Sequence, residues 1–376
     1  MFIKNIYKEV ISIKDMKKLS AFLLSAFILG TQSSFAFAKE ITPIEIVNKV
    51  LEMKQQSFTG TKLQKVVRQN LKLEANANVE YVNSENFNIT LKQPSGISGI
   101  KFATNSGKSA IYFPYEKLSF TDAVSTSGEM ITDTVLGKIT TDADLLQKNY
   151  NVTMKNDDEI ATNPTYVIDI QPKRQVDSHW GTPGRTYWVS KNNFQILRED
   201  RYWAPNIEPF FSSQFTDYKA LSFSTSPNVR LKLPYDVKKV ELGEKNEKSE
   251  TYLQSFKSAD EAEKKSKEKI YLPNYLPEGF KLKELQLLNF YDTKIIVQKY
   301  TDGLNSMFVT YRTKPNFFLT LVAGAFSLNL IHKMSDLSYH APYNYMSKET
   351  KENLIISFGD LYPDDLQKVC SSLSLK

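Results

Sequence analysis

Two hydrophobic patterns alternate along the chain, one with helical spacing and one with the alternation of strands. Apolar residues such as Val47 and Leu51 recur at helical spacing just after Thr42 and Glu45, which form a capping-box pattern. We therefore expect a helix over about residues 43–56. A strongly apolar face of this kind is typical of a helix that packs against a core, and a helix that plugs an open curved sheet is the more specific alternative.

Most of the first 240 residues show the strand pattern instead. In one run Phe87, Ile89 and Leu91 alternate with polar residues, so one face of the strand is expected to face the core and the other to face solvent. A short helix is expected at 140–149. The expected strands cover residues 62–68, 75–82, 86–91, 100–104, 110–115, 150–154, 165–171, 185–190, 195–203, 210–226 and 231–240. Consecutive antiparallel strands with one apolar face predict a curled sheet.

A second domain begins with the stretch 271–312. Pro273 and Pro277 favour an extended entry, and two β-rich runs flank Asp302-Gly303, a dipeptide that tolerates positive φ. The pattern predicts a hairpin closed near this dipeptide. We expect four segments in the chain: 1–38 as a signal peptide, 39–240 as the first domain, 241–269 as a charged linker or exposed helix, and 270–376 as the second domain.

Two further segments of the second domain carry expectations. The apolar stretch 317–331 is too short to span a bilayer and predicts a core strand, with a membrane-touching loop as the alternative. The last segment, 360–371, has the pattern of an amphipathic helix. Cys370 lies in that helix and is expected to be buried there.

The N-terminus has the pattern of a secretory signal. Lys17 and Lys18 precede an apolar run, and Ala36-Phe37-Ala38 matches a small-x-small cleavage site. We predict cleavage after Ala38 and delivery to the periplasm, with Met16 as an alternative start. Removing residues 1–38 lowers the formal net charge from +6 to +3, which is too mild to indicate nucleic-acid binding.

The chemistry-bearing residues show no catalytic arrangement. The chain has one Cys and three His, and neither His332 nor His340 has a Glu in register for a metal site. Acidic pairs such as Asp157-Asp158 fall in turn-like contexts. The 23 Phe and 20 Tyr residues favour sheets with large apolar surfaces. We therefore expect a binding protein that is not an enzyme and needs no cofactor or metal.

Several motifs carry a family resemblance. Leu146-Gln-Lys-Asn-Tyr150, a strand ending in Pro172-Lys173, and Tyr187-Trp188 followed by Phe194 to Arg198 resemble the first domain of the RseB/MucB family of sigma-E regulators. That domain shares its fold with LolA and LolB. Leu276-Pro277-Glu278-Gly279-Phe280 and Tyr300-Thr301-Asp302-Gly303-Leu304 are similar to the family's "LPxGF" and "YSDGL" elements.

Three positions depart from the family pattern. Thr301 stands where the family has Ser, Asn305 where Ala is common, and Ser190 where Asp usually follows the Trp. The resemblance implies an α+β fold: a LolA-like antiparallel β half-barrel with plugging helices, followed by a smaller antiparallel α+β domain. A LolA or LolB chain would end after the first of these.

The resemblance also implies a function. The expected protein is a periplasmic, lipid-sensing regulator that holds the periplasmic domain of an anti-sigma factor and protects it from proteolysis. Release would follow binding of the acyl chain of a lipid, lipoprotein or lipopolysaccharide. The alternatives are a LolA-like carrier with no regulatory partner, or a scaffold filled by its own side chains. The sequence leaves homo-oligomer formation open.

Two sets of site residues follow. The alternation of apolar residues predicts a lipid-binding groove on one side of the sheet, and a register error of one residue would invert the set. The groove residues are Phe87, Ile89, Leu91, Ile111, Phe113, Val167 and Tyr187. The resemblance places the partner-binding function in the second domain, at Tyr300, Asp302, Gly303 and Leu304.

Overall fold

The structure is a computed structural model of the 376-residue chain. It describes residues 41–52, 56–68, 71–83, 85–105, 108–121, 136–137, 139, 142–176, 179–180, 182–221, 229, 233–241, 251–290, 293–313, 343–349 and 354–373. The expected signal peptide and the apolar stretch 317–331 lie outside these residues. No helix within the described ranges is long and apolar enough to cross a membrane.

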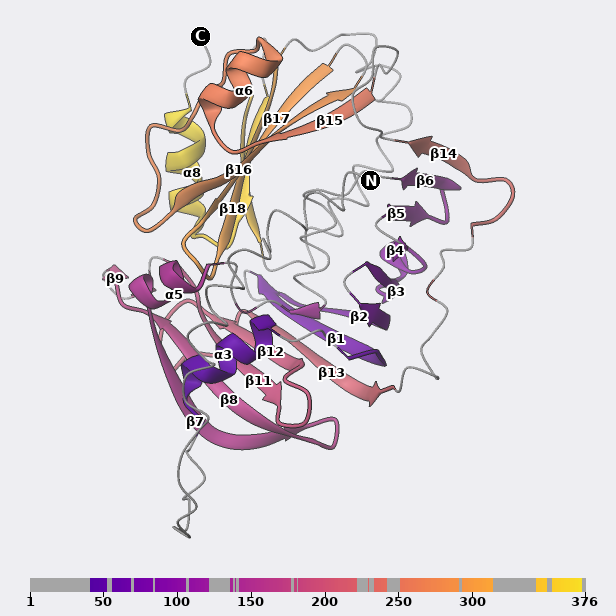
Figure 1. Ribbon diagram of the computed structural model, residues 1–376, viewed down its shortest axis with the longest axis vertical. Helices are drawn as coiled ribbons and strands as arrows, with labels where there is room; N and C mark the ends of the chain where they lie inside the picture. The colour runs from indigo at the N-terminus through magenta and orange to yellow at the C-terminus, as the bar shows by residue number, and fades with distance from the viewer. Residues whose placement is uncertain are drawn as a thin grey trace, which may run out of the picture.

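The first domain is built on one open sheet of 12 strands, which bends so that β3 to β6 rise away from the rest (Figure 1). Neighbouring strands are antiparallel except for β14 and β6, which are parallel. In spatial order the strands are β14 (Lys238–Glu241), β6 (Leu118–Thr121), β5 (Lys108–Phe113), β4 (Lys101–Asn105), β3 (Asn86–Gln93), β2 (Leu71–Asn83), β1 (Phe58–Arg68), β13 (Phe211–Ala220), β12 (Ile196–Tyr202), β11 (Gly184–Ser190), β8 (Asn163–Pro172) and β7 (Tyr150–Ile160).

Among the described residues, two α-helices pack on this sheet. Helix α3 (Pro43–Glu52) begins with the expected capping box: the Glu45 amide donates to Thr42 Oγ1 at 3.2 Å, and the Thr42 amide donates to Glu45 Oε2 at 2.7 Å. Helix α5 (Ala143–Asn149) is capped by Asp142, whose side chain accepts from the Leu145 amide. A 3₁₀ turn, η1 (Ser95–Ile97), and the short pair β9 (Gln175–Val176) and β10 (His179–Trp180) complete the domain.

The described part of the second domain is a smaller antiparallel sheet with two α-helices. In spatial order its strands are β15 (Thr251–Phe256), β16 (Lys281–Phe290), β17 (Thr293–Thr301), β18 (Ser306–Thr313), β20 (Leu354–Gly359) and β19 (Asn344–Glu349). The expected hairpin at Asp302-Gly303 is confirmed, because it joins β17 to β18 where Thr301 pairs with Ser306. The α+β class and the open half-barrel are confirmed as well.

Several elements differ in extent from the sequence-based expectation, and two segments differ most clearly. Strand β7 continues to Ile160 through Asn156 and Asp157, which were expected to end it, because a bulge between Lys155 and Asp158 absorbs the irregularity. Strand β15 and helix α6 (Ala259–Ser266) lie within the segment 241–269, which was expected to be a linker or exposed helix. There they join the second sheet and bury Phe256 and Ala262.

The buried side chains of the described residues form three apolar clusters. The first lies on β1 to β5 and continues onto β7, β8 and β11 to β13, and the second fills the second domain between its sheet and α8 (Pro363–Ser372). The third joins α3 and α5 to β8, β11 and β12, and includes Leu304 of the second domain. Because this cluster contains side chains from both domains, the two domains share part of their core.

Helix α8 gives a direct test of the second core. Leu366 is completely buried against β20, so Leu366→Ala leaves a cavity and should lower the free energy of unfolding by about 2–5 kcal/mol. Gln367, next to it on the exposed side, is the matched control, and Gln367→Ala should change stability by less than about 0.5 kcal/mol. Urea unfolding measures both, and equal effects would contradict the packing described here.

Candidate functional site

The loop between β17 and β18 is held in shape by its own side chains. The carboxylate of Asp302 accepts hydrogen bonds from the amides of Leu304 at 3.0 Å and Asn305 at 2.7 Å. Thr301 Oγ1 accepts from the Gly303 amide at 3.1 Å and donates to the Asn305 carbonyl at 2.9 Å. Short polar side chains that bond to the nearby backbone favour tight turns, which explains why this sequence forms a compact loop.

This loop lies directly against helix α5 of the first domain (Figure 1). Gly303 has φ +103°, and a Cβ atom on it would lie 2.4 Å from the Leu146 amide nitrogen, closer than real Cβ contacts. The Asn149 side chain donates to the Asp302 carbonyl at 2.7 Å, and the Tyr150 hydroxyl donates to the Asp302 carboxylate. Only glycine allows this close approach between the domains.

A buried polar cluster lies beside the loop and joins the two domains. Arg185 on β11 donates to Asn305 Oδ1 at 2.8 Å and to Asp360 Oδ2 at 2.9 Å. Arg201 on β12 donates to Asp360 Oδ1 at 2.5 Å. Both arginines also donate to Glu199 Oε1, at 3.0 and 2.7 Å. All five side chains are at most 5% exposed, so the charges are removed from water and paired with one another, although Arg185 Nε and Glu199 Oε2 make no hydrogen bond.

Electrostatics keep the arginines of this cluster charged. Burial acts to lower the pKa of Arg185, but Tyr187, Asp360 and Glu199 outweigh it and hold the pKa well above its usual value. Burial and the neighbouring guanidinium act to lower the pKa of Arg201, and the two carboxylates again outweigh them. Burial also raises the pKa of Asp302, although hydrogen bonds from Tyr150 and the loop amides oppose that shift.

The three departures from the family pattern have structural roles. Asn305 uses its side chain across the interface, accepting from Arg185 and donating to the Tyr150 hydroxyl at 2.8 Å and the Pro183 carbonyl at 3.3 Å. Thr301 has the same hydroxyl as Ser, and that hydroxyl makes the loop bonds. Ser190 Oγ accepts from the Asn192 amide at 3.2 Å, a turn contact that an Asp carboxylate can also make.

The structure brings six of the seven expected groove residues into one apolar cluster. Five of them come from β3 and β5, and Val167 comes from β8. All six side chains are less than a tenth exposed, so this face is covered in the structure. These residues are Phe87, Ile89, Leu91, Ile111, Phe113 and Val167.

Tyr187 does not join them. It packs in the cluster of α3 and α5, and the expectation that it shares a side with Val167 is corrected by the strand pairing. Tyr187 pairs with Ile168, while Trp188 pairs with Val167, so Tyr187 and Val167 point to opposite sides of β8 and β11. Alternation within one strand does not fix which residues of neighbouring strands face each other.

The expected partner-binding residues lie at the domain interface. Asp302 and Leu304 are 2% and 7% exposed, and Gly303 contacts α5. Tyr300 is buried in the core of the second domain, where its hydroxyl donates to Gln298. In this structure the four residues shape the contact between the domains, and their role in partner binding stays a prediction.

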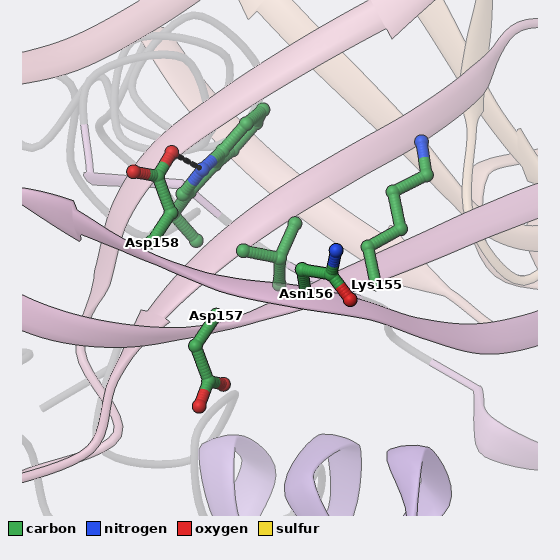
Figure 2. A pocket seen from close by; sticks show the side chains of 6 residues that line it. Lys155, Asn156, Asp157 and Asp158 are labelled. Carbon is green, nitrogen blue, oxygen red and sulfur yellow. Dashed lines mark hydrogen bonds between the residues drawn. The ribbon is translucent and has the colours of Figure 1, made fainter.

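The acidic pair of β7 lines an open hollow of about 530 Å³ together with Lys155, Asn156, Val167 and Trp188. Figure 2 shows that Asp157 and Asp158 point to opposite sides of the strand. Asp157 pairs with Lys191, and Asp158 accepts from the Trp188 indole at 2.8 Å. The Glu159 amide and this indole lower the pKa of Asp158. The two carboxylates therefore do not form an acid–base pair.

Sequence reasoning did not single out the polar cluster. The available signal was the run Arg198-Glu199-Asp200-Arg201 inside an expected strand, because alternate charges in a strand that is otherwise buried require partners. Asp360 and Asn305 gave no comparable signal, since their partners are more than 100 residues away in the sequence. Among the described residues, no group of three or more acidic, His or Cys side chains could hold a metal ion.

No protein-family model matches the chain, and no curated protein is significantly similar to it. Solved structures do match. A crystal structure of MucB aligns with 89% of this chain and 98% of its own, with a TM-score of 0.54 and 13% identity. The chain has the fold of MucB.

Two complexes of MucB agree with this result. The Pseudomonas aeruginosa MucA/MucB complex covers 89% of this chain and 99% of the matched chain, with a TM-score of 0.53 and 14% identity. MucB in complex with MucA(peri) gives a TM-score of 0.51 at 13% identity. Because the match covers 89% of the chain, the likeness to MucB includes both domains.

The polar cluster predicts a large effect of one substitution. Asp360→Asn keeps the shape of the side chain but removes the negative charge that both arginines share, so we expect a loss of about 3–5 kcal/mol in the free energy of unfolding. Asp364, exposed in the first turn of α8, is the control, and Asp364→Asn should cost at most about 1 kcal/mol. Urea unfolding followed by circular dichroism compares them, and similar losses would show that the cluster is not stabilising.

Proposed function

We propose that this protein is a periplasmic regulator that binds the periplasmic segment of an anti-sigma factor and shields it from proteolysis until a lipid binds. The observation that carries the proposal is the fold, which matches MucB over both domains, including two structures of MucB in complex with MucA. The secretory pattern of residues 1–38 supports a periplasmic location.

The domain interface supports a binding role in place of catalysis. Arg185, Glu199 and Arg201 would be the natural candidates for chemistry, but they are buried and bonded to one another, and both arginines also bond to Asp360 of the second domain. What they provide is a fixed orientation between two sheets. A partner segment that contacts both domains would therefore meet a preformed surface, which lowers the entropy lost on binding.

The apolar face of β1 to β5 supports the lipid-sensing part. Each CH₂ group of an acyl chain gains about 0.8 kcal/mol on burial, so a chain of ten carbons supplies several kcal/mol to shift a two-state equilibrium. The six clustered groove residues are covered in this structure, so we expect lipid binding to require this face to open. That requirement would couple lipid binding to a change of shape and thus to release of the partner.

The test combines binding with protection. The periplasmic segment of the single-span anti-sigma factor from the same genome should bind the purified protein with a Kd below about 10 μM in interferometry. In the bound state, that segment should be cut more slowly by an added protease. Decanoate should reverse both effects.

Two results would contradict the proposal in different ways. A segment that neither binds nor gains protection would remove the regulatory role. Binding of decanoate without any such partner would favour the carrier function, in which the protein delivers a lipid or lipoprotein.

A further inference from the structure

A lysine lies at the boundary between the polar cluster and the apolar face. Lys62 on β1 has no exposed surface, and its ammonium group has no hydrogen-bond partner among the described residues. The ammonium nitrogen lies 4.9 Å from the centroid of the Phe215 ring. A buried unpaired ammonium is among the most costly features that a protein core can contain.

Three of the four oxygens of the two carboxylates in the cluster accept hydrogen bonds from the arginines. Glu199 Oε1 accepts from both arginines, and each oxygen of Asp360 accepts from one of them. Burial lowers the pKa of Lys62 to about 8; attraction by Glu199 opposes this shift only in part, and repulsion by Arg201 adds to it. Glu199 Oε2 is also buried without a hydrogen bond. Lys62 is therefore a buried cation whose ammonium makes no hydrogen bond to either carboxylate of the cluster.

Strand register places Lys62 next to the apolar face. It pairs with Ala77 on β2, and Ala77 pairs with Leu91 on β3. Neighbouring strands are about 4.8 Å apart, so Leu91 is about 10 Å from Lys62 along the same face. Beyond Leu91 this face continues as Ile89 and Phe87, which belong to the same apolar cluster. On the other side, Lys62 pairs with Phe215 on β13, which belongs to this cluster as well, so one cation stands on a continuous apolar surface.

We propose that Lys62 binds the anionic headgroup, a carboxylate or a phosphate, of an amphiphile whose acyl chain lies on the apolar face of β2 to β5. This rests on the proposed lipid-sensing function and specifies the ligand class for the same face. The headgroup gives the ammonium the charged hydrogen bond that it lacks, and such bonds are strongest where water is excluded. Retaining a costly cation in a core is itself typical of functional sites.

The binding test uses three ligands with the same ten-carbon chain: decanoate, decyl phosphate and decanol, all below micelle formation. The wild-type protein should bind at least one of the two anions at least about tenfold tighter than decanol, a difference of about 1.4 kcal/mol. The stronger anion identifies carboxylate or phosphate as the headgroup. Lys62→Met should lose this preference and keep its affinity for decanol.

Lys65 provides the matched control. It lies on the same strand, its side chain is 54% exposed, and it pairs with Glu74 at the surface. Lys65→Met should behave as the wild type does towards all three ligands. Equal preference for the anions in wild type and Lys62→Met would overturn the role of Lys62 while leaving lipid binding intact. Failure of all three ligands to bind would remove both the inference and the lipid-sensing function.

Proton uptake gives a second readout. With a pKa of about 8, Lys62 is half protonated at pH 8, and a bound anion raises its pKa. Calorimetry at pH 8 in buffers of different ionisation enthalpy should show uptake of up to about half a proton per anion bound in the wild type. No uptake should occur with decanol or with Lys62→Met, and uptake by the variant equal to that of the wild type would contradict the assignment.

Stability in the absence of ligand separates this role from a purely structural one. The pKa of Lys62 is lower in the folded state than in the unfolded state, so the unfolded state binds more protons between pH 8 and 10.5. Stability of the wild type should therefore rise with pH across that window. Lys62→Met should be more stable than the wild type at pH 7 and should lack this rise. If Lys62→Met were less stable than the wild type at pH 7, Lys62 would stabilise the buried Glu199 carboxylate in the folded protein, and its role would be structural.

Discussion

The arrangement of the two domains depends on two guanidinium groups that share two carboxylates, all of them buried from solvent. Arg185 and Arg201 come from the first sheet together with Glu199, and Asp360 comes from the second. Once desolvated, these charges are stable only in each other's presence. Partial separation of the domains would leave charges buried without partners, so the contact is expected to be either fully formed or fully open.

The loop at Asp302 and Gly303 determines where this contact forms. Ion pairs tolerate some variation in geometry, whereas Gly303 against the Leu146 amide allows almost none, because any side chain would overlap the backbone of α5. Asn305 then connects the loop to Arg185. Close backbone packing therefore sets the relative orientation of the two domains, and the buried charges make it energetically costly to separate them. A motif that looks like a simple hairpin in the sequence is the point at which both constraints meet.

The sequence predicts local features well and long-range pairing poorly. The capping box at Thr42, the hairpin at Asp302-Gly303 and the burial of Cys370 depend on neighbouring residues, and the structure confirms all three. Tyr187 was assigned to the wrong group because strand register depends on distant partners. The polar cluster does not follow from the sequence for the same reason, since its members can be recognised as partners only when the fold brings residues 185 and 360 together.

Lys62 lies between the charges of the domain interface and the apolar face of the first sheet. Its electrostatic neighbour Arg201 bonds to Glu199 and to Asp360 of the second domain, and its cross-strand neighbour Ala77 belongs to the apolar face. A ligand shifts a conformational equilibrium only by its difference in affinity for the two states. An anion placed beside Glu199 and Arg201 repels the first and attracts the second, so it changes the balance of the charges that hold the domains together. An uncharged chain on the apolar face has no such effect, and this difference gives an anionic lipid a physical route to the interface.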